Sequence, residues 1–174
     1  GVEGSISTLP IGFKGFDVLA DLNLAAERLT DCALHFSKLE RETGRTIRLA
    51  IEPEPFCLIE TTEEAIAFFK LLWQVASKRK SEEAVRRHIG LCYDVCHQAI
   101  EFEEADEAIG SPTREGIRIN KVQISCAIHI DRPGESPEAR DALRHYIEPR
   151  YLHQTYALTS EETVLTVMDL SDKF

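Results

Sequence analysis

The chain has 174 residues and carries 30 acidic against 20 basic side chains, for a formal net charge of -10. Its length is that of one domain and is short for a complete (β/α)8 barrel, which needs roughly 200 residues or more. Such an acidic chain is a poor match to a phosphate backbone, which disfavours nucleic acid as a partner. No apolar run is long enough to span a membrane, and the N-terminus lacks the basic start and apolar core of a signal peptide.

The cysteines predict reduced thiols in a cytoplasmic protein. Their number, five, is odd, and most of them lie in apolar segments, where we expect them to be buried. Cys92 and Cys96 are four positions apart, which is not the CxxC spacing of a zinc knuckle or a redox pair. The cysteines are Cys32, Cys57, Cys92, Cys96 and Cys126.

The first part of the chain predicts a loop, a long helix and a strand. Residues 1–14 are rich in Gly, Ser and Thr and contain Pro10, which is typical of a loop. Apolar side chains recur at three-to-four spacing over 16–42, which predicts one helix that Gly44 ends. The run Thr46–Glu52 follows as a strand that finishes on a carboxylate.

The middle of the chain alternates helices with strands. The S/T-x-x-E pattern at 61–64 is a capping box, which predicts a helix to about residue 79. Ser81 is expected to cap a short helix to about residue 88, and Ile89–Asp94 is the second predicted strand. Residues 98–110 are expected to form a loop and a short acidic helix.

The last part of the chain predicts a strand, a helix and a hairpin. Ile117–Cys126 is the third predicted strand, and Ser136-Pro137 starts a helix to about residue 147. Two β-rich runs over 151–158 and 163–170 favour an antiparallel hairpin. The alternation before them predicts an α/β fold, in which helices pack on a parallel sheet and right-handed crossovers bring the strand ends to one edge.

Polar side chains stand at these strand ends. Glu52 and Asp94 each finish an apolar run, His97 follows three residues later, and we expect both carboxylates to converge with the Gln123–Ser125 segment. Two carboxylates and an imidazole suit a divalent cation such as Mg, Mn, Zn or Co. Carboxylates at strand ends are more often helix caps or salt-bridge partners than metal ligands, and on spacing alone both interpretations stay open.

Further candidates are weaker. Glu54 follows Glu52 by two residues and points to the same side of an extended chain, as a second acid or base or as an exposed loop carboxylate. His153 lies among large residues at a strand start, where a hydrogen-bonded structural role is the better interpretation, and His129 has a similar balance.

Several of these stretches resemble a known superfamily. LAIEPEP at 49–55 and LCYDVCH at 91–97 resemble the strand-end Glu and the Asp-x-x-His of the xylose isomerase-like TIM-barrel superfamily, and KVQISCA at 121–127 resembles its next strand. More narrowly, SISTLP, IEPEP, CYDVCHQAIEFE, KVQIS and RYLHQ together resemble the Ebo-type metabolite-traffic proteins, a branch linked to export or processing of a small metabolite.

This resemblance implies a fold and a set of roles. The fold is a partial (β/α)8 TIM barrel in one domain over 1–174, with β/α units over 15–150 and a hairpin over 151–170. Metal ligands would be Glu52, Asp94 and Gln123, and Glu52 would also move the proton. Gln123 stands where many members have a histidine. Substrate contacts would come from His97, Glu54 and His153.

The implied activity is that of a metal-dependent sugar (phosphate) isomerase or epimerase acting on a small polyhydroxylated metabolite. The alternative is a non-catalytic metabolite-binding protein of the same fold. Gln123 in place of a histidine favours the alternative, whereas Glu52 with Asp94 and His97 favours the enzyme. A phosphodiesterase of the endonuclease type is the third class, and the acidic charge disfavours it.

Members of the resembling branch are longer than this chain, so we expect a fragment that forms about half of a barrel. A half-barrel exposes sheet edges and an apolar inner face. We therefore expect a homo-oligomer, such as a dimer of half-barrels, or a terminal hairpin that covers the gap.

Overall fold

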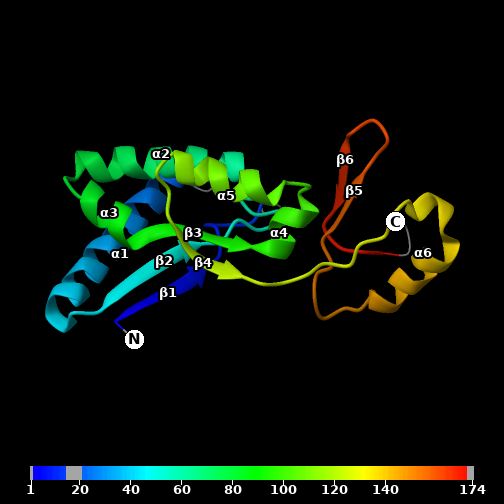
Figure 1. Cartoon of the computed structure of the whole chain (residues 1–174), viewed down its shortest axis with the longest axis horizontal. Helices are drawn as coiled ribbons and strands as arrows, with labels where there is room; N and C mark the ends of the chain where they lie inside the picture. The colour runs from blue at the N-terminus through cyan, green and yellow to red at the C-terminus, as the bar shows by residue number, and fades with distance from the viewer. Residues whose placement is uncertain (1, 15–20, 172–174) are drawn as a thin grey trace.

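The computed structural model describes residues 2–14 and 21–171 and contains a parallel α/β sheet, outer helices and a separate hairpin (Figure 1). Its elements in chain order are β1 (Glu3–Thr8), α1 (Leu22–Thr43), β2 (Thr46–Ile51), α2 (Thr62–Lys78), α3 (Glu82–His88), β3 (Ile89–Asp94), α4 (Val95–Ile100), α5 (Ala105–Arg114), β4 (Ile119–Gln123), α6 (Pro137–Leu143), β5 (Thr155–Leu158) and β6 (Val164–Val167), with short 3-10 turns at Pro133–Glu135 and Arg144–Tyr146.

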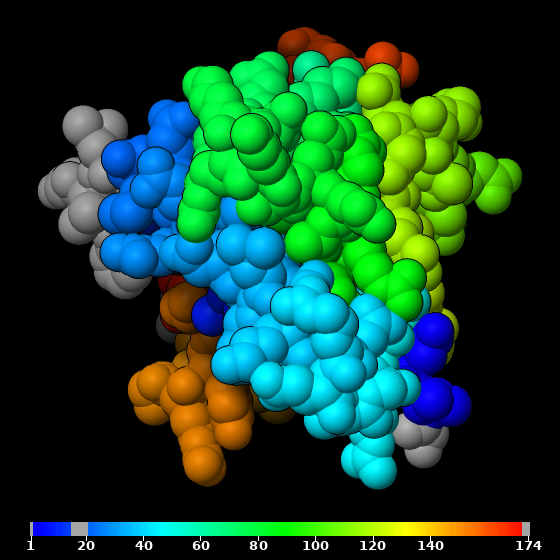
Figure 2. All heavy atoms as spheres, turned by 90° about the vertical axis from the view of Figure 1, so that its left-hand side faces the viewer, coloured from blue at the N-terminus to red at the C-terminus, as the bar shows by residue number. Residues whose placement is uncertain are grey.

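The sheet has the order β1-β2-β3-β4, and neighbouring strands are all parallel. Four parallel strands with helices on one face form about half of a (β/α)8 barrel, which confirms the predicted fold class. All four strands end at the same edge. Figure 2 views the opposite end, where the strands begin, and the α1–β2 connection (cyan) and the α2–α3 segment (green) fill much of that face.

The prediction of a loop over 1–14 is wrong for the strand β1. Its backbone pairs along β2 from Glu3 with Thr46 to Thr8 with Ile51. Most of its side chains are exposed, so the segment has no alternating apolar pattern that would reveal a strand. Backbone pairing with β2, rather than side-chain burial, therefore makes it a strand.

The ends of α1 and α2 follow local rules. Asp21 caps α1, with its side chain accepting from two backbone amides, and Gly44 ends the helix at φ 68° in the left-handed region. The first part of the helix predicted over 16–42 includes residues 16–20, which lie outside the described residues. In α2 the capping box is complete, since Thr61 accepts from Glu64 N and the Glu64 side chain accepts from Thr61 N.

Other local features differ from the prediction. Ser81 and Ser136 precede α3 and α6 as expected, but neither side chain makes the capping hydrogen bond. A helix, α4, begins at Val95, so residues 98–100 are helical instead of a loop. The third predicted strand, Ile117–Cys126, is shorter at both ends, because β4 runs only from Ile119 to Gln123.

The apolar core lies between the sheet and the helices. Odd-numbered residues of β2 and β3 such as Ile51 and Leu91 pack there against Phe69 and Leu72 of α2. The opposite face of the sheet carries small or polar side chains, where an apolar inner face was expected. The residues on that face include Ser7, Ala50, Gly90, Cys92 and Lys121.

The hairpin of β5 and β6 is antiparallel, as predicted, with Thr155 opposite Val167. It contacts the loop that follows β2. The Tyr156 hydroxyl donates to Glu60, and the Tyr156 ring lies edge-on to Phe56 at 5.5 Å between centroids. The hairpin is therefore anchored beyond the strand ends. Within the described residues, no helix is both long and apolar enough to cross a membrane.

Candidate functional site

A cluster of polar side chains, the strand-end cluster, lies at the edge where the strands end. It is formed by Glu52, Asp94 and Gln123. Asp94 and Gln123 are register partners in β3 and β4, and Glu52 directly follows β2. The Gln123 amide nitrogen donates to Glu52 Oε1 at 2.8 Å and to Asp94 Oδ2 at 2.9 Å. Two carboxylates from different strands therefore converge on one atom, which confirms the predicted convergence.

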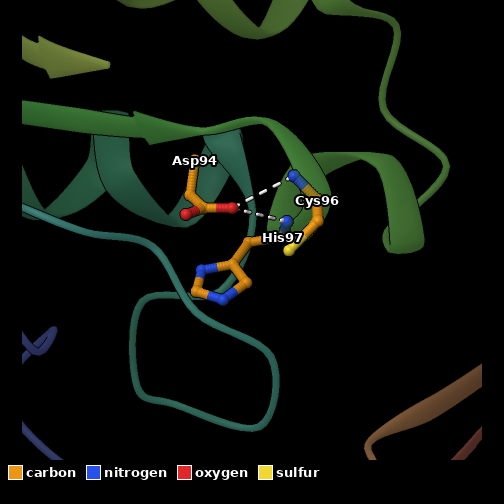
Figure 3. A group of neighbouring side chains, drawn as sticks. All are labelled: Asp94, Cys96 and His97. Carbon is orange, nitrogen blue, oxygen red and sulfur yellow. Dashed lines mark hydrogen bonds between the residues drawn. The ribbon is translucent and has the colours of Figure 1, made fainter. Parts of the chain in front are cut away.

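Asp94 has a second contact set, shown in Figure 3. Its other oxygen, Oδ1, accepts from the backbone amides of Cys96 at 3.0 Å and His97 at 3.3 Å, so Asp94 is the N-cap of α4. The Ser125 hydroxyl donates to the same oxygen at 2.5 Å. Burial raises the pKa of Asp94, but hydrogen bonds from Ser125 and Gln123 outweigh it and bring the pKa to about 2. Asp94 is thus a cap and a member of the strand-end cluster at once.

His97 lies beside Glu52. Its Nδ1 is 3.3 Å from the carbonyl oxygen of Pro53 and 3.4 Å from Glu52 Oε1, and the side chain is 22% exposed. Asp94, Cys96 and His97 each offer a ligand atom, and these atoms lie within 4.8 Å of one another. Cys96 was not among the predicted ligands, because it was weighed only together with Cys92, at a spacing that is not CxxC.

Two more residues of the cluster were missed. Lys121 Nζ donates to Gln123 Oε1 and to Ser7 Oγ, both at 2.7 Å, and Ser7 Oγ is 3.3 Å from Gln123 Oε1. A register shift between β3 and β4 explains the position of Lys121: Leu91 pairs with Ile119, but Cys92 pairs with Lys121. The extra residue turns Lys121 from the helix side to the site side of the sheet.

The two remaining predicted residues, Glu54 and His153, differ in how they relate to the strand-end cluster. Glu54 follows Pro53, and burial, followed by the charges of Glu52 and Asp94, raises its pKa. His153 belongs to the C-terminal part, where its backbone amide donates to Asp169 and its ring lies 3.4 Å from the same carboxylate. Glu54 is thus electrostatically part of the cluster, and His153 has partners of its own.

A groove of about 660 Å³ lies next to the strand-end cluster, and its lining comes both from the sheet part of the chain and from the C-terminal part that carries the hairpin. His97 and Cys96 contribute to one side, and His153 and Tyr156 come from the C-terminal part. Most of the lining is apolar and includes Ile100, Phe102, Ile128, Leu152 and Leu158. A volume of this size is typical of small-molecule sites.

A second acidic pair, Glu60 and Glu101, lies under the hairpin. Burial and the neighbouring Glu60 carboxylate raise the pKa of Glu101 to about 8. Burial acts against ionisation of Glu60 too, but hydrogen bonds from Lys14 and Tyr156 lower its pKa. The pair therefore holds one proton at neutral pH, and Lys14 Nζ lies 2.6 Å from Glu60 Oε2 and 2.7 Å from Glu64 Oε1.

The strand-end donors suit a divalent cation in part. Glu52 and Asp94 present oxygens to one point, and His97 and Cys96 add nitrogen and sulfur donors that favour Zn over Mg. Gln123 presents its nitrogen to that point, and its oxygen is engaged by Lys121. Ligation by the Gln123 oxygen requires the amide to turn, so this predicted role stays a prediction.

Comparison with known proteins gives little more. No protein-family model matches this chain, and no curated protein matches it either. Among solved structures, the apo form of 3-keto-D-glucoside 4-epimerase from E. coli is similar with a TM-score of 0.40 and 11% sequence identity, over 81% of this chain. The match spans 63% of that enzyme's chain. A likeness of this degree carries no inference about what this chain does.

Proposed function

We propose that the strand-end cluster is the site of a metal-dependent, sugar isomerase- or epimerase-like activity on a small polyhydroxylated metabolite. The observation that supports it best is the convergence of Glu52 and Asp94 on one point, within 2.9 Å of a shared atom. The resemblance of the IEPEP and DVCH stretches to the xylose isomerase-like superfamily points to the same class.

In this proposal Asp94 and His97 have one task each, and Glu52 has two. Glu52 and Asp94 would hold the cation, and a bound cation would polarise adjacent hydroxyl and carbonyl oxygens of the substrate. Glu52 is the proposed base that moves the proton at carbon. Asp94, with a pKa of about 2, stays ionised throughout the physiological range. His97 borders both Glu52 and the groove, so it is placed to contact a substrate hydroxyl.

A second function, non-catalytic binding of a metabolite, is favoured by one observation. The Gln123 amide nitrogen lies between the two carboxylates, where it satisfies both of them without a cation. Such a site offers fixed hydrogen-bond donors and acceptors to a polyhydroxylated ligand, and binding it requires no catalytic step.

The first experiment is elemental analysis of protein purified without chelator, beside Asp94→Asn and the control Asp141→Asn on exposed helix α6. The enzyme proposal expects stoichiometric Mn, Zn or Co in the wild type and the control, and a loss in Asp94→Asn. Sugars and polyols are then incubated in D2O. Deuterium incorporated at carbon by the wild type but not by Glu52→Gln supports epimerisation. Metal-free protein that binds a sugar without exchange supports the binding protein instead.

A further inference from the structure

Lys121 is the one cation that contacts Gln123 among the described residues, and it does so from the side opposite to the carboxylates. Its Nζ donates to Gln123 Oε1 and to Ser7 Oγ at 2.7 Å each. Both of these acceptors are neutral oxygens. The network therefore connects the two outer strands of the sheet, since Ser7 belongs to β1 and both Lys121 and Gln123 belong to β4.

An ammonium group has three donors and no acceptor, which decides how the amide is oriented. With Lys121 charged, the Gln123 oxygen must face Nζ, since the amide nitrogen would oppose donor to donor. The Gln123 nitrogen then has to face Glu52 and Asp94, and it donates to both at 2.8 and 2.9 Å. The lysine thus determines which end of the amide the carboxylates meet.

We propose that Lys121 is a positioning residue that locks Gln123 with its nitrogen toward Glu52 and Asp94 and thereby weakens the binding of a divalent cation there. The proposal deepens the proposed function, on which its metal-binding part rests. A cation between the carboxylates has to displace the Gln123 nitrogen, and the displaced amide has to give up or reverse its bond to Lys121. Charge-assisted hydrogen bonds of this kind are among the stronger ones in proteins.

Lys121 acts on a cation in two separable ways. Its own positive charge repels the cation directly, and its hydrogen bond holds the amide in the opposing orientation. Only the second effect passes through Gln123. A double-mutant cycle between the two residues therefore isolates it, because a purely direct charge effect is the same whatever residue occupies position 123.

The cycle uses Mn2+ as the probe and compares wild type, Lys121→Met, Gln123→Leu and the double variant by calorimetric titration. Lys121→Met is expected to tighten Mn2+ binding by about tenfold or more, the size of one lost charge-assisted hydrogen bond. In the Gln123→Leu background the same change is expected to have an effect at least about threefold smaller. Lys70→Met, which removes an equal charge from the ion pair with Glu115 at 3.1 Å, is the control and should change nothing.

A second measurement decides the amide orientation without any metal. The side-chain NH2 of Gln123 should give a well-resolved, slowly exchanging NMR pair in the wild type. In Lys121→Met, and in Lys121→Gln as a second variant, exchange of that pair with solvent should rise about tenfold, by the loss of one strong hydrogen bond. An unchanged pair, or an equal effect of Lys121→Met in both backgrounds of the cycle, overturns the proposal. If no protein binds Mn2+, the proposed metal function fails, and the NMR pair alone decides whether Lys121 positions the amide.

Discussion

Gly90 lies in β3 where the backbone of β4 and a side chain that reaches β2 pass very close. An alanine at this position should destabilise the sheet. A Cβ at position 90 would lie 2.4 Å from the carbonyl oxygen of Arg118 and 2.6 Å from Asn120 Nδ2. Both neighbours are engaged. Leu91 N donates to the Arg118 oxygen at 2.8 Å, and Asn120 Nδ2 crosses β3 to donate to the Leu49 oxygen at 2.8 Å.

The size of the effect follows from these distances. An ordinary contact begins at 3.4 Å, so the Arg118 carbonyl has to retreat by 1.0 Å (3.4 minus 2.4), which breaks its ladder hydrogen bond. Overpacking costs about 1–3 kcal/mol. Two weakened hydrogen bonds add roughly 0.5–1.5 kcal/mol each. Gly90→Ala should therefore lower the free energy of unfolding by about 2–6 kcal/mol, the sum of the overpacking cost and the cost of two weakened hydrogen bonds.

Urea unfolding followed by circular dichroism measures this change. Gly4→Ala is the matched control, because Gly4 also lies in a strand, and a Cβ there meets nothing within 4 Å. The control should be neutral or slightly stabilising, since alanine has less conformational freedom in the unfolded chain. If Gly90→Ala were as stable as Gly4→Ala to within about 0.5 kcal/mol, the close approach of β4 over Gly90 would be refuted.

Two further predictions concern charge and capping. Glu101 keeps its proton up to about pH 8 in the folded chain but loses it near 4.5 when unfolded, so stability is fullest below pH 4.5 and falls as the pH rises toward 8. The folded pKa of Glu60 is lowered from 4.5, so the stability that Glu60 contributes is constant above pH 4.5 and does not add to this decline. Glu101→Gln should flatten this decline in melting temperatures measured from pH 5 to 8, and exposed Glu161→Gln should not. Thr61→Ala removes one half of the α2 capping box and should lower the unfolding free energy by about 1 kcal/mol in urea titrations, whereas a change below about 0.3 kcal/mol would mean that the cap is not formed.

The sequence was sufficient where burial and local rules agree. Ile89–Asp94 is observed with the predicted bounds, since all six of its residues are buried and the apolar pattern is uninterrupted. The same holds for the Gly44 end of α1 and for the capping box at Thr61. These features depend on residues near in sequence, so a local pattern is enough to predict them. The convergence of Glu52 and Asp94 followed from parallel topology alone.

The missed features depend on contacts that a local pattern does not contain. β1 is a strand because β2 pairs with it, and its exposed side chains leave no alternation. The bulge of β4 did leave a signal, because its apolar residues change from odd positions, Ile117 and Ile119, to even ones, Val122 and Ile124. Plain alternation from Ile119 puts Lys121 on the helix side, so its role at the site needed that change of parity to be noticed.

The two functions of Asp94 affect how its variants should be interpreted. Asparagine is as good an N-cap as aspartate, so Asp94→Asn preserves the cap of α4 through the oxygen that accepts from Cys96 and His97. The new amide nitrogen then faces Gln123 Nε2, where Asp94 Oδ2 accepted at 2.9 Å, and two donors oppose each other. One charge-assisted bond is lost, so Asp94→Asn should lower the unfolding free energy by about 1.5–3 kcal/mol.

That loss should depend on Gln123. In a Gln123→Leu background no donor opposes the new amide, so Asp94→Asn should cost at least about 1 kcal/mol less in urea titrations. An equal loss in both backgrounds would show that the Gln123 nitrogen does not lie between the carboxylates, and the metal-free arrangement of the cluster would have to be abandoned. A metal lost from Asp94→Asn while the cap and the fold persist would then be attributable to the missing charge of one carboxylate rather than to unfolding of α4.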